Sequence, residues 1–237
     1  MKLLVLQHIE CEHPGQLRHY LQRDGINWHA VELDEGEAIP DLQDFDAMWV
    51  MGGPMDVWDT KEHPWLVAEK AAIREWVLEL KRPYLGLCLG HQLLADALGG
   101  KCDKLDPPEI GVLNIELTEA GIEDPIFRDM PKQQKALQWH SVQVTETPDN
   151  CIVLARSPAC ENQAMKVGQH AWSMQYHVEV EPDTVDNWAA IPAYRSALIN
   201  TLGEDALPGL LQDASAQLDS FAANSELLYR NFMASVS

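Results

Sequence analysis

The stretch PYLGLCLGHQLLADALGG, residues 83–100, decides the fold. Its apolar segment, Tyr84–Leu87, predicts a buried β-strand, and the run from His91 to Leu98 predicts a helix that stops at a Gly-Gly pair. Between the two lies Cys88, with one glycine two residues before it and another two residues after it. The sequence therefore predicts a cysteine at a strand-to-helix turn, one unit of an α/β fold.

A cysteine at such a turn is displayed above the sheet as a nucleophile. The turn crowds neighbouring chains, so the flanking positions must be small, as Gly86 and Gly90 are. The helix dipole favours the reactive thiolate, and the N–H of Leu89 points toward the same space and can stabilise an oxyanion. A buried structural cysteine is the alternative, but the strand-helix context favours Cys88 as a nucleophile for acyl transfer through a thioester.

A cysteine nucleophile needs a base, usually a histidine held by an acid. Among nine histidines, His177 ends the apolar segment AWSMQY, and Glu179 follows two residues later. In an extended segment this spacing puts both side chains on one face, so Glu179 can orient His177. A surface His/Glu pair is the alternative. His140 has no acid two residues later, which makes it a weaker candidate for the base.

The first half of the chain alternates between strands and helices. This order predicts an α/β fold with an open, twisted, mostly parallel sheet and helices on both faces. The predicted strands are Lys2–Leu6, Trp28–Leu33, Asp46–Met51 and Tyr84–Leu87, and the predicted helices are Pro14–Asp24, Pro64–Lys81 and His91–Leu98.

From Glu109 onward the pattern changes to short strands, which indicate antiparallel hairpins added to the sheet. They are Val112–Leu117, Ala136–Trp139, Val142–Val144, Ile152–Ala155, Ala164–Val167 and Ala171–Tyr176. Pro192 should kink or split a helix over Pro182–Leu202, and one or two helices follow over Leu207–Met233. We expect one domain over residues 1–203, with residues 204–237 as a helical extension packed on it.

Composition excludes several classes of protein. A net charge of −20 over 237 residues argues against a nucleic-acid partner. The N-terminus lacks a signal or membrane-spanning pattern. Five widely spaced cysteines without a CxxC predict neither disulfides nor zinc, so a reducing cytoplasm is the simplest compartment. A P-loop pattern is missing, and no cofactor or metal is expected.

A cluster of polar residues, QHIECEH, follows the first strand. It contains His8, Glu10, Cys11, Glu12 and His13, which could form a metal site. A polar loop at the C-terminal edge of the sheet, with a role at the substrate rim or none, is the interpretation we favour, because ligands bind at this edge in such folds.

Three motifs resemble those of one family. PYLGLCLGHQLL is similar at every position to the active-site signature of class I (triad-type) glutamine amidotransferases. MQYHVEVEP resembles their second signature, usually QFHPE, and MGGPMDV resembles their Gly-Gly-Pro oxyanion loop. The motifs occur in the family's order over most of the chain, and the nearest resemblance is to a stand-alone GMP-synthase-like group. One departure is Val178, where the family usually has proline.

The resemblance implies a flavodoxin-like fold and a role for each matched residue. Cys88 would attack the side-chain amide of glutamine, His177 would move protons and Glu179 would orient it. Ammonia would leave, and water would then release glutamate. The remaining implied residues are Gly53 and Leu89 for the oxyanion, and Gly52, Gln92, His140 and Ser141 for the substrate.

The sequence is compatible with three functions. The first is a glutaminase that feeds ammonia to an unknown acceptor or to a partner synthetase. The second is a free-standing hydrolase of γ-glutamyl peptides or conjugates, whose amide presents the same electrophile. The third is a non-catalytic regulatory protein, which the complete Cys/His/Glu set argues against. The sequence leaves the ammonia acceptor and the oligomeric state open.

Overall fold

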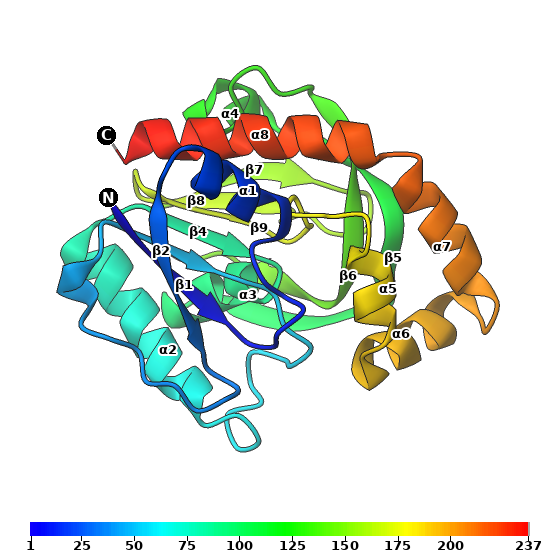
Figure 1. The fold of residues 1–237 in the computed structure, drawn as a ribbon, viewed down its shortest axis with the longest axis horizontal. Helices are drawn as coiled ribbons and strands as arrows, with labels where there is room; N and C mark the ends of the chain where they lie inside the picture. Colours follow the sequence, from blue (N-terminus) through cyan, green and yellow to red (C-terminus); the bar gives the residue numbers. More distant parts are fainter. Residues whose placement is uncertain (237) are drawn as a thin grey trace.

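A single mixed sheet organises the chain in a computed structural model that describes residues 1–236 (Figure 1). These residues form nine strands in the order β2-β1-β3-β4-β9-β8-β7-β5-β6. The first five strands of this order pair in parallel: β2 (Asn27–Glu32), β1 (Lys2–Gln7), β3 (Ala47–Val50), β4 (Tyr84–Leu87) and β9 (Ala171–Met174). The predicted open α/β sheet is confirmed.

Antiparallel strands extend the sheet beyond β9, as the hairpin pattern predicted. They are β8 (Ala164–Val167), β7 (Cys151–Arg156), β5 (Lys101–Leu117) and β6 (Gln133–Glu146). Two strands predicted at Ala136–Trp139 and Val142–Val144 are wrong as separate elements, because β6 runs through both. β5 begins eleven residues earlier than the predicted Val112, at Lys101.

Two prolines explain why the first part of β5 was not predicted from the sequence. Pro107 and Pro108 argue against a strand, because proline donates no hydrogen bond to a ladder. In the structure both prolines fall inside a register shift between Lys104 and Glu109, where β5 and β6 are not paired residue by residue. The ladder therefore continues on either side of the prolines.

Helices cover both faces of the parallel strands. α1 (Gly15–Arg23) and α8 (Leu218–Ser235) lie on one face, and α2 (Trp65–Arg74) and α3 (Leu89–Ala97) lie on the other. Strand β1 shows the alternation that this layering requires, since Leu3 and Val5 join the first core and Leu4 and Leu6 the second.

The remaining helical elements are short or split. The predicted helix at Pro64–Lys81 is α2 followed by a π-helical segment, η2 (Glu75–Leu80). Pro192 does split its helix, because α5 (Thr184–Ala189) ends before it and α6 (Pro192–Leu202) begins on it. The other elements are η1 (Leu42–Asp44), α4 (Glu119–Glu123), η3 (Pro125–Phe127) and α7 (Ala206–Ser215).

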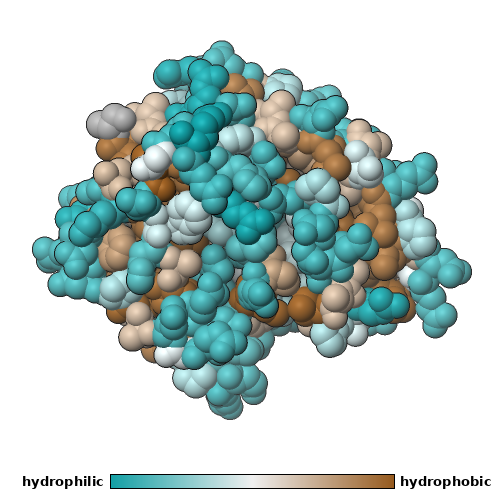
Figure 2. Space-filling model, in the orientation of Figure 1, coloured by the Kyte–Doolittle hydropathy of each residue, from teal (hydrophilic) through white to brown (hydrophobic). Residues whose placement is uncertain are grey.

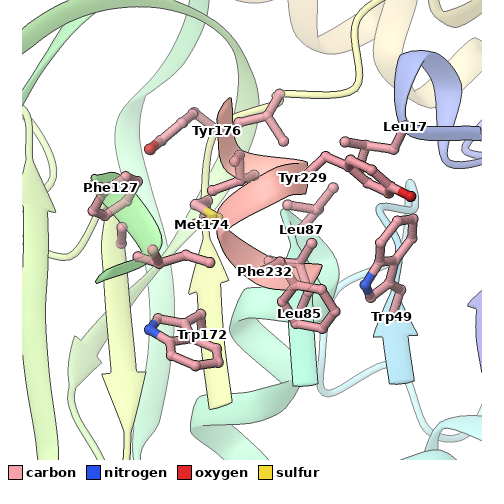
Figure 3. Packing of buried hydrophobic residues seen from close by; sticks show 14 of the residues in the cluster. Leu17, Trp49, Leu85, Leu87, Phe127, Trp172, Met174, Tyr176, Tyr229 and Phe232 are labelled. Carbon is pink, nitrogen blue, oxygen red and sulfur yellow. The ribbon is translucent and has the colours of Figure 1, made fainter. Parts of the chain in front are cut away.

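The C-terminal helix, α8, packs over the central strands of the sheet. Figure 3 shows Phe232 against Trp49 and Trp172, with ring centroids 5.9 and 6.3 Å apart. The hydroxyl of Tyr20 donates to the carbonyl of Ala222 at 2.9 Å, which ties α1 to α8. The division of the chain at residue 203 stays a prediction.

A third core lies under the antiparallel end of the sheet. Trp139 of β6 contacts Trp188 of α5 and Tyr194 of α6, with ring centroids 6.0 and 5.9 Å apart. The α5–α7 helices thus form a wall beside β5 and β6. The face seen in Figure 2 is mostly hydrophilic, and among residues 1–236 no helix is long and apolar enough to cross a membrane.

Candidate active site

Cys88 occupies the turn between β4 and α3, as predicted. Its φ of 50° and ψ of −103° are rarely adopted by a residue with a side chain, which is the strained geometry of a nucleophile at a strand-to-helix turn. A Cβ added to Gly90 would lie 2.1 Å from the carbonyl oxygen of Val50, and one added to Gly86 would lie 2.5 Å from that of Gly90. Both flanking positions therefore require glycine.

His177 and Glu179 form a buried pair after β9. Nδ1 of His177 lies 2.7 Å from Oε1 of Glu179, and the backbone N–H of His177 donates to the carbonyl of Leu137. Oε2 of Glu179 accepts from the N–H of Val178 at 2.8 Å. The backbone of Glu179 is fixed too, because its carbonyl accepts from the N–H of Gln16 at 2.8 Å.

The charges of Cys88 and His177 are coupled. Burial raises the pKa of the Cys88 thiol, and the nearby His177 opposes this rise. Burial also lowers the pKa of His177, but the Glu179 carboxylate and the Cys88 sulfur raise it by more, so the net pKa lies well above its usual value. His177 is therefore a strong acceptor for the proton that Cys88 must lose. The helix dipole favours the thiolate form of Cys88, but burial of the side chain disfavours it.

Two backbone N–H groups near Cys88 are free. Within residues 1–236, neither Gly53 nor Leu89 donates its N–H to an acceptor. The two residues are close, since a Cβ on Gly53 would lie 3.0 Å from Cδ2 of Leu89. Unpaired N–H groups beside a nucleophile are what an oxyanion site requires.

A pocket opens beside the thiol. Gln92, His140 and Ser141, three of the predicted substrate residues, line it together with Cys88 and Gly53. Its other lining residues are Pro54, Met55, Asp56, Ile110, Trp139, Val142, Ala193, Tyr194 and Ala197. The fourth predicted substrate residue, Gly52, lies outside this lining.

Hydrogen bonds hold two of the lining residues in place. Nε2 of Gln92 donates to the carbonyl of Val142 and to Oε1 of Gln175, at 3.3 and 3.2 Å. Nδ1 of His140 bonds to the same Val142 carbonyl at 2.8 Å, and its Nε2 lies 3.2 Å from a carboxylate oxygen of Glu109. Gln92 and His140 thus present fixed surfaces to the pocket.

Two residues of the site were not predicted from the sequence. Gln175 places Nε2 3.7 Å from the sulfur of Cys88, and its position two residues before His177 was a signal that could have found it. Tyr194 lines the pocket from α6 and donates its hydroxyl to Glu12. Nothing in the sequence marked Tyr194, because its element lies far along the chain from the motifs.

In the polar cluster that follows β1, the fold buries two residues, His8 and Glu12. His8 and Glu12 are 1% and 2% exposed, so a substrate-rim role is wrong for these two residues. Burial raises the pKa of the Glu12 carboxyl. Oε2 of Glu12 lies 2.4 Å from where a Cβ on Gly52 would be, and Cβ of His8 lies 3.0 Å from where a Cβ on Gly53 would be. Both side chains therefore pack against the Gly-Gly-Pro loop.

Among residues 1–236, one group of side chains could hold a metal ion. Single ligand atoms of Glu12, His177 and Glu179 all lie within 4.8 Å of one another. A metal bound there would displace the hydrogen bond between His177 and Glu179 at 2.7 Å. The geometry therefore favours a histidine–carboxylate pair over a metal centre.

Known proteins share this sequence and fold. Residues 10–188 match the family model "Glutamine amidotransferase class-I". The chain is 33% identical over 168 residues to a GMP synthase (glutamine-hydrolyzing) of Aeropyrum pernix, covering 68% of this chain but only 30% of that protein. It is 30% identical over 170 residues to one subunit of the GMP synthase (glutamine-hydrolyzing) of Sulfolobus acidocaldarius, covering 70% of this chain and 86% of that subunit.

A solved structure is similar over nearly the whole chain. The crystal structure of a glutamine amidotransferase from Thermotoga maritima superposes with a TM-score of 0.85 at 26% identity, covering 98% of each chain. The likeness thus includes the antiparallel end of the sheet and the C-terminal helices.

Proposed function

Because the chain belongs to the class I glutamine amidotransferase family, we propose that it is an amidohydrolase in which Cys88 attacks the side-chain amide of glutamine. The observation that carries this proposal is the strained turn at Cys88 beside the buried His177–Glu179 pair. Nucleophile, base and orienting acid are the three parts that acyl transfer by a cysteine requires.

Each step has a group to perform it. The sulfur of Cys88 attacks the amide carbon, and its proton moves to Nε2 of His177, because Nδ1 is bonded to Glu179. The N–H groups of Gly53 and Leu89 bind the oxyanion of the tetrahedral intermediate. His177 returns the proton to the leaving nitrogen, ammonia departs, and a glutamyl thioester remains. Water then attacks the thioester with His177 as base and releases glutamate.

The pocket supplies the contacts for glutamine itself. Gln92 has both hydrogen bonds on Nε2, so its Oε1 is free among the described residues to accept from the substrate. His140 and Ser141 would line the glutamyl group through their backbone. Gly52 would act through the loop rather than by contact.

The relatives suggest a destination for the ammonia. The protein from Sulfolobus acidocaldarius is named as one subunit of a GMP synthase, which implies that it works with a second. We propose that this chain likewise serves a synthetase partner. The acceptor that this partner would aminate is a separate question from the chemistry at Cys88.

A second candidate function uses the same residues. The pocket lining includes four apolar side chains that could receive an apolar leaving group: Ile110, Trp139, Ala193 and Ala197. A free-standing hydrolase of γ-glutamyl peptides or conjugates would use such a wall, whereas ammonia needs none. The complete set of reacting groups argues against a purely regulatory protein.

Steady-state kinetics on the isolated chain test these proposals. Glutamine and γ-glutamyl dipeptides are compared, with ammonia or amino-acid release as the readout. Efficient cleavage of a dipeptide with poor use of glutamine would favour the hydrolase. A glutamine-derived affinity label should modify Cys88 alone, in wild type and in Cys160→Ser, and labelling confined to Cys11 or Cys160 would reject the assignment.

A further inference from the structure

His8 is buried at the end of β1, and both nitrogens of its ring are bonded. Nδ1 lies 2.7 Å from the carbonyl oxygen of Gly52, and Nε2 lies 2.8 Å from Oε1 of Glu69 on α2. Neither side chain of the His8–Glu69 pair has solvent exposure. Buried ion pairs are weak contributors to stability compared with apolar residues of the same volume, so the pair needs another reason.

The hydrogen bonds fix one proton on His8. The Gly52 carbonyl can only accept, so Nδ1 of His8 carries a proton. Nε2 faces the Glu69 carboxyl, and a second proton is shared between these two side chains. Burial lowers the pKa of His8, but Glu69, the Gly52 carbonyl and Glu12 raise it by more, so the net pKa is above its usual value. The raised pKa favours the imidazolium form of His8, in which the bond to Gly52 is charge-assisted.

This bond sets the direction of the next peptide group. In a trans peptide the C=O and N–H point in opposite directions. With the Gly52 carbonyl turned to His8, the N–H of Gly53 points away from His8. The sheet order places β3 between β1 and β4, and His8, Gly53 and Cys88 follow these three strands. The side away from His8 is therefore the side of Cys88.

We infer that His8 and Glu69 are positioning residues that hold the Gly52–Gly53 peptide with the Gly53 N–H turned toward Cys88, so that the oxyanion site exists in the free chain. The inference rests on the proposed role of Gly53 in binding the oxyanion. Two adjacent glycines allow the peptide to flip at little steric cost. The His8–Glu69 pair removes that freedom before any partner binds.

The test separates the pair from the rest of the fold. His8→Phe keeps a ring that can stack on Trp65, whose centroid lies 5.4 Å from that of His8, but removes both nitrogens. Glu69→Met, made in the same chain, avoids leaving a buried carboxylate unpaired. We expect the double variant to lose about 10- to 100-fold in kcat for glutamine, since one oxyanion donor contributes ~10²–10³-fold, with KM within about twofold.

Matched variants control for stability. His170→Phe makes the same change at a remote histidine, whose Nε2 bonds to the carbonyl of Val77 at 3.1 Å, and should leave kcat unchanged. Glu69→Gln keeps the shape of the pair but removes the charge assistance, so its kcat should lie between those of wild type and the double variant. It serves as the test if the double variant does not fold.

The outcomes distinguish the two levels of the proposal. An active wild-type chain whose double variant keeps kcat within about twofold overturns the inference and leaves the proposed function intact. A loss confined to KM overturns it as well. An isolated wild-type chain that cleaves neither glutamine nor a γ-glutamyl dipeptide overturns the preformed oxyanion site. If the glutamine-derived label also fails to modify Cys88, the proposed function is overturned with it.

Discussion

The N–H of Val178 donates to Oε2 of Glu179 at 2.8 Å, while Oε1 of the same carboxylate bonds to His177. The family signature that this segment resembles has proline at this position, and proline has no N–H to donate. The valine therefore gives the orienting acid a second donor from the backbone, and both carboxylate oxygens of Glu179 are engaged.

Replacing this valine by proline should weaken the hydrogen bonding that orients His177. Val178→Pro removes the donor, and a hydrogen bond to a charged group contributes about 1.5–3 kcal/mol, only part of which bears on catalysis. We expect kcat for glutamine to fall by ~3- to 10-fold. Val178→Ala keeps the N–H and should stay within about twofold of wild type. Equal activities in the two variants would show that the donor is unimportant.

The base and its orienting acid should contribute unequally. His177→Ala removes the only proposed proton acceptor and should lower kcat by about 10⁴-fold or more. Glu179→Ala leaves an imidazole that has lost its anchor and should retain more activity, because the ring can still accept a proton. Ammonia release under single-turnover conditions measures both variants. Full activity in His177→Ala would mean that another residue is the base.

Glycine at position 90 should be required for folding as well as for display of the thiol. A Cβ there would lie 2.1 Å from the Val50 carbonyl, and such overpacking costs typically about 1–3 kcal/mol or more. Gly90→Ala should therefore lower the free energy of unfolding by at least about that amount. Gly209→Ala is the control, because the space around Gly209 in α7 is open.

The control variant Gly209→Ala should raise the free energy of unfolding. Alanine in a helix is about 0.5–1 kcal/mol more favourable than glycine, so Gly209→Ala should stabilise the chain. Urea unfolding measures both variants. Destabilisation by both, or by neither, would contradict the predicted contrast between the two positions.

A buried neutral histidine should make stability depend on pH. Burial, with the nearby His140, lowers the pKa of His91 to about 3, and its Nδ1 bonds to the hydroxyl of Ser173 at 2.9 Å. Because the folded pKa lies below the usual value of about 6.5, the unfolded chain binds this proton first. The contribution of His91 is thus complete above that value and is lost as the pH falls toward 3.

The prediction for His91 is tested by the slope of the unfolding free energy against pH. One proton corresponds to about 1.4 kcal/mol per pH unit. Between about pH 6 and pH 4, His91→Gln should reduce the pH slope of the unfolding free energy by about this amount. Asn27→Gln, at an exposed position on β2 without a titratable side chain, should leave the slope unchanged. An unaltered slope in His91→Gln would show that His91 is already protonated in the folded chain.

The elements nearest the motifs were the most predictable from sequence. The turn at Cys88 follows from local spacing, because a small residue on each side and a strand-helix context are visible in a few letters. The His177–Glu179 contact is likewise local, since it depends only on a two-residue spacing in an extended segment. The turn and the contact could both be predicted without information about distant parts of the chain.

Long-range contacts could not be read from the sequence. Tyr194 reaches the pocket only because α6 folds back beside β5 and β6, and Glu69 meets His8 across 61 residues of chain. The prolines of β5 concealed a strand whose ladder resumes beyond them. In each case the partner is chosen by tertiary packing, which local spacing does not encode.

The position of α8 has a consequence for synthesis on the ribosome. The strands that carry Trp49 and Trp172 are translated before α8, the helix that covers them and includes Phe232. The nascent chain therefore exposes an apolar sheet face after all its proposed reacting groups have been made, and chaperones recognise such surfaces. Emergence of α8 from the ribosome, rather than synthesis of Cys88 or His177, sets the moment at which this face can close.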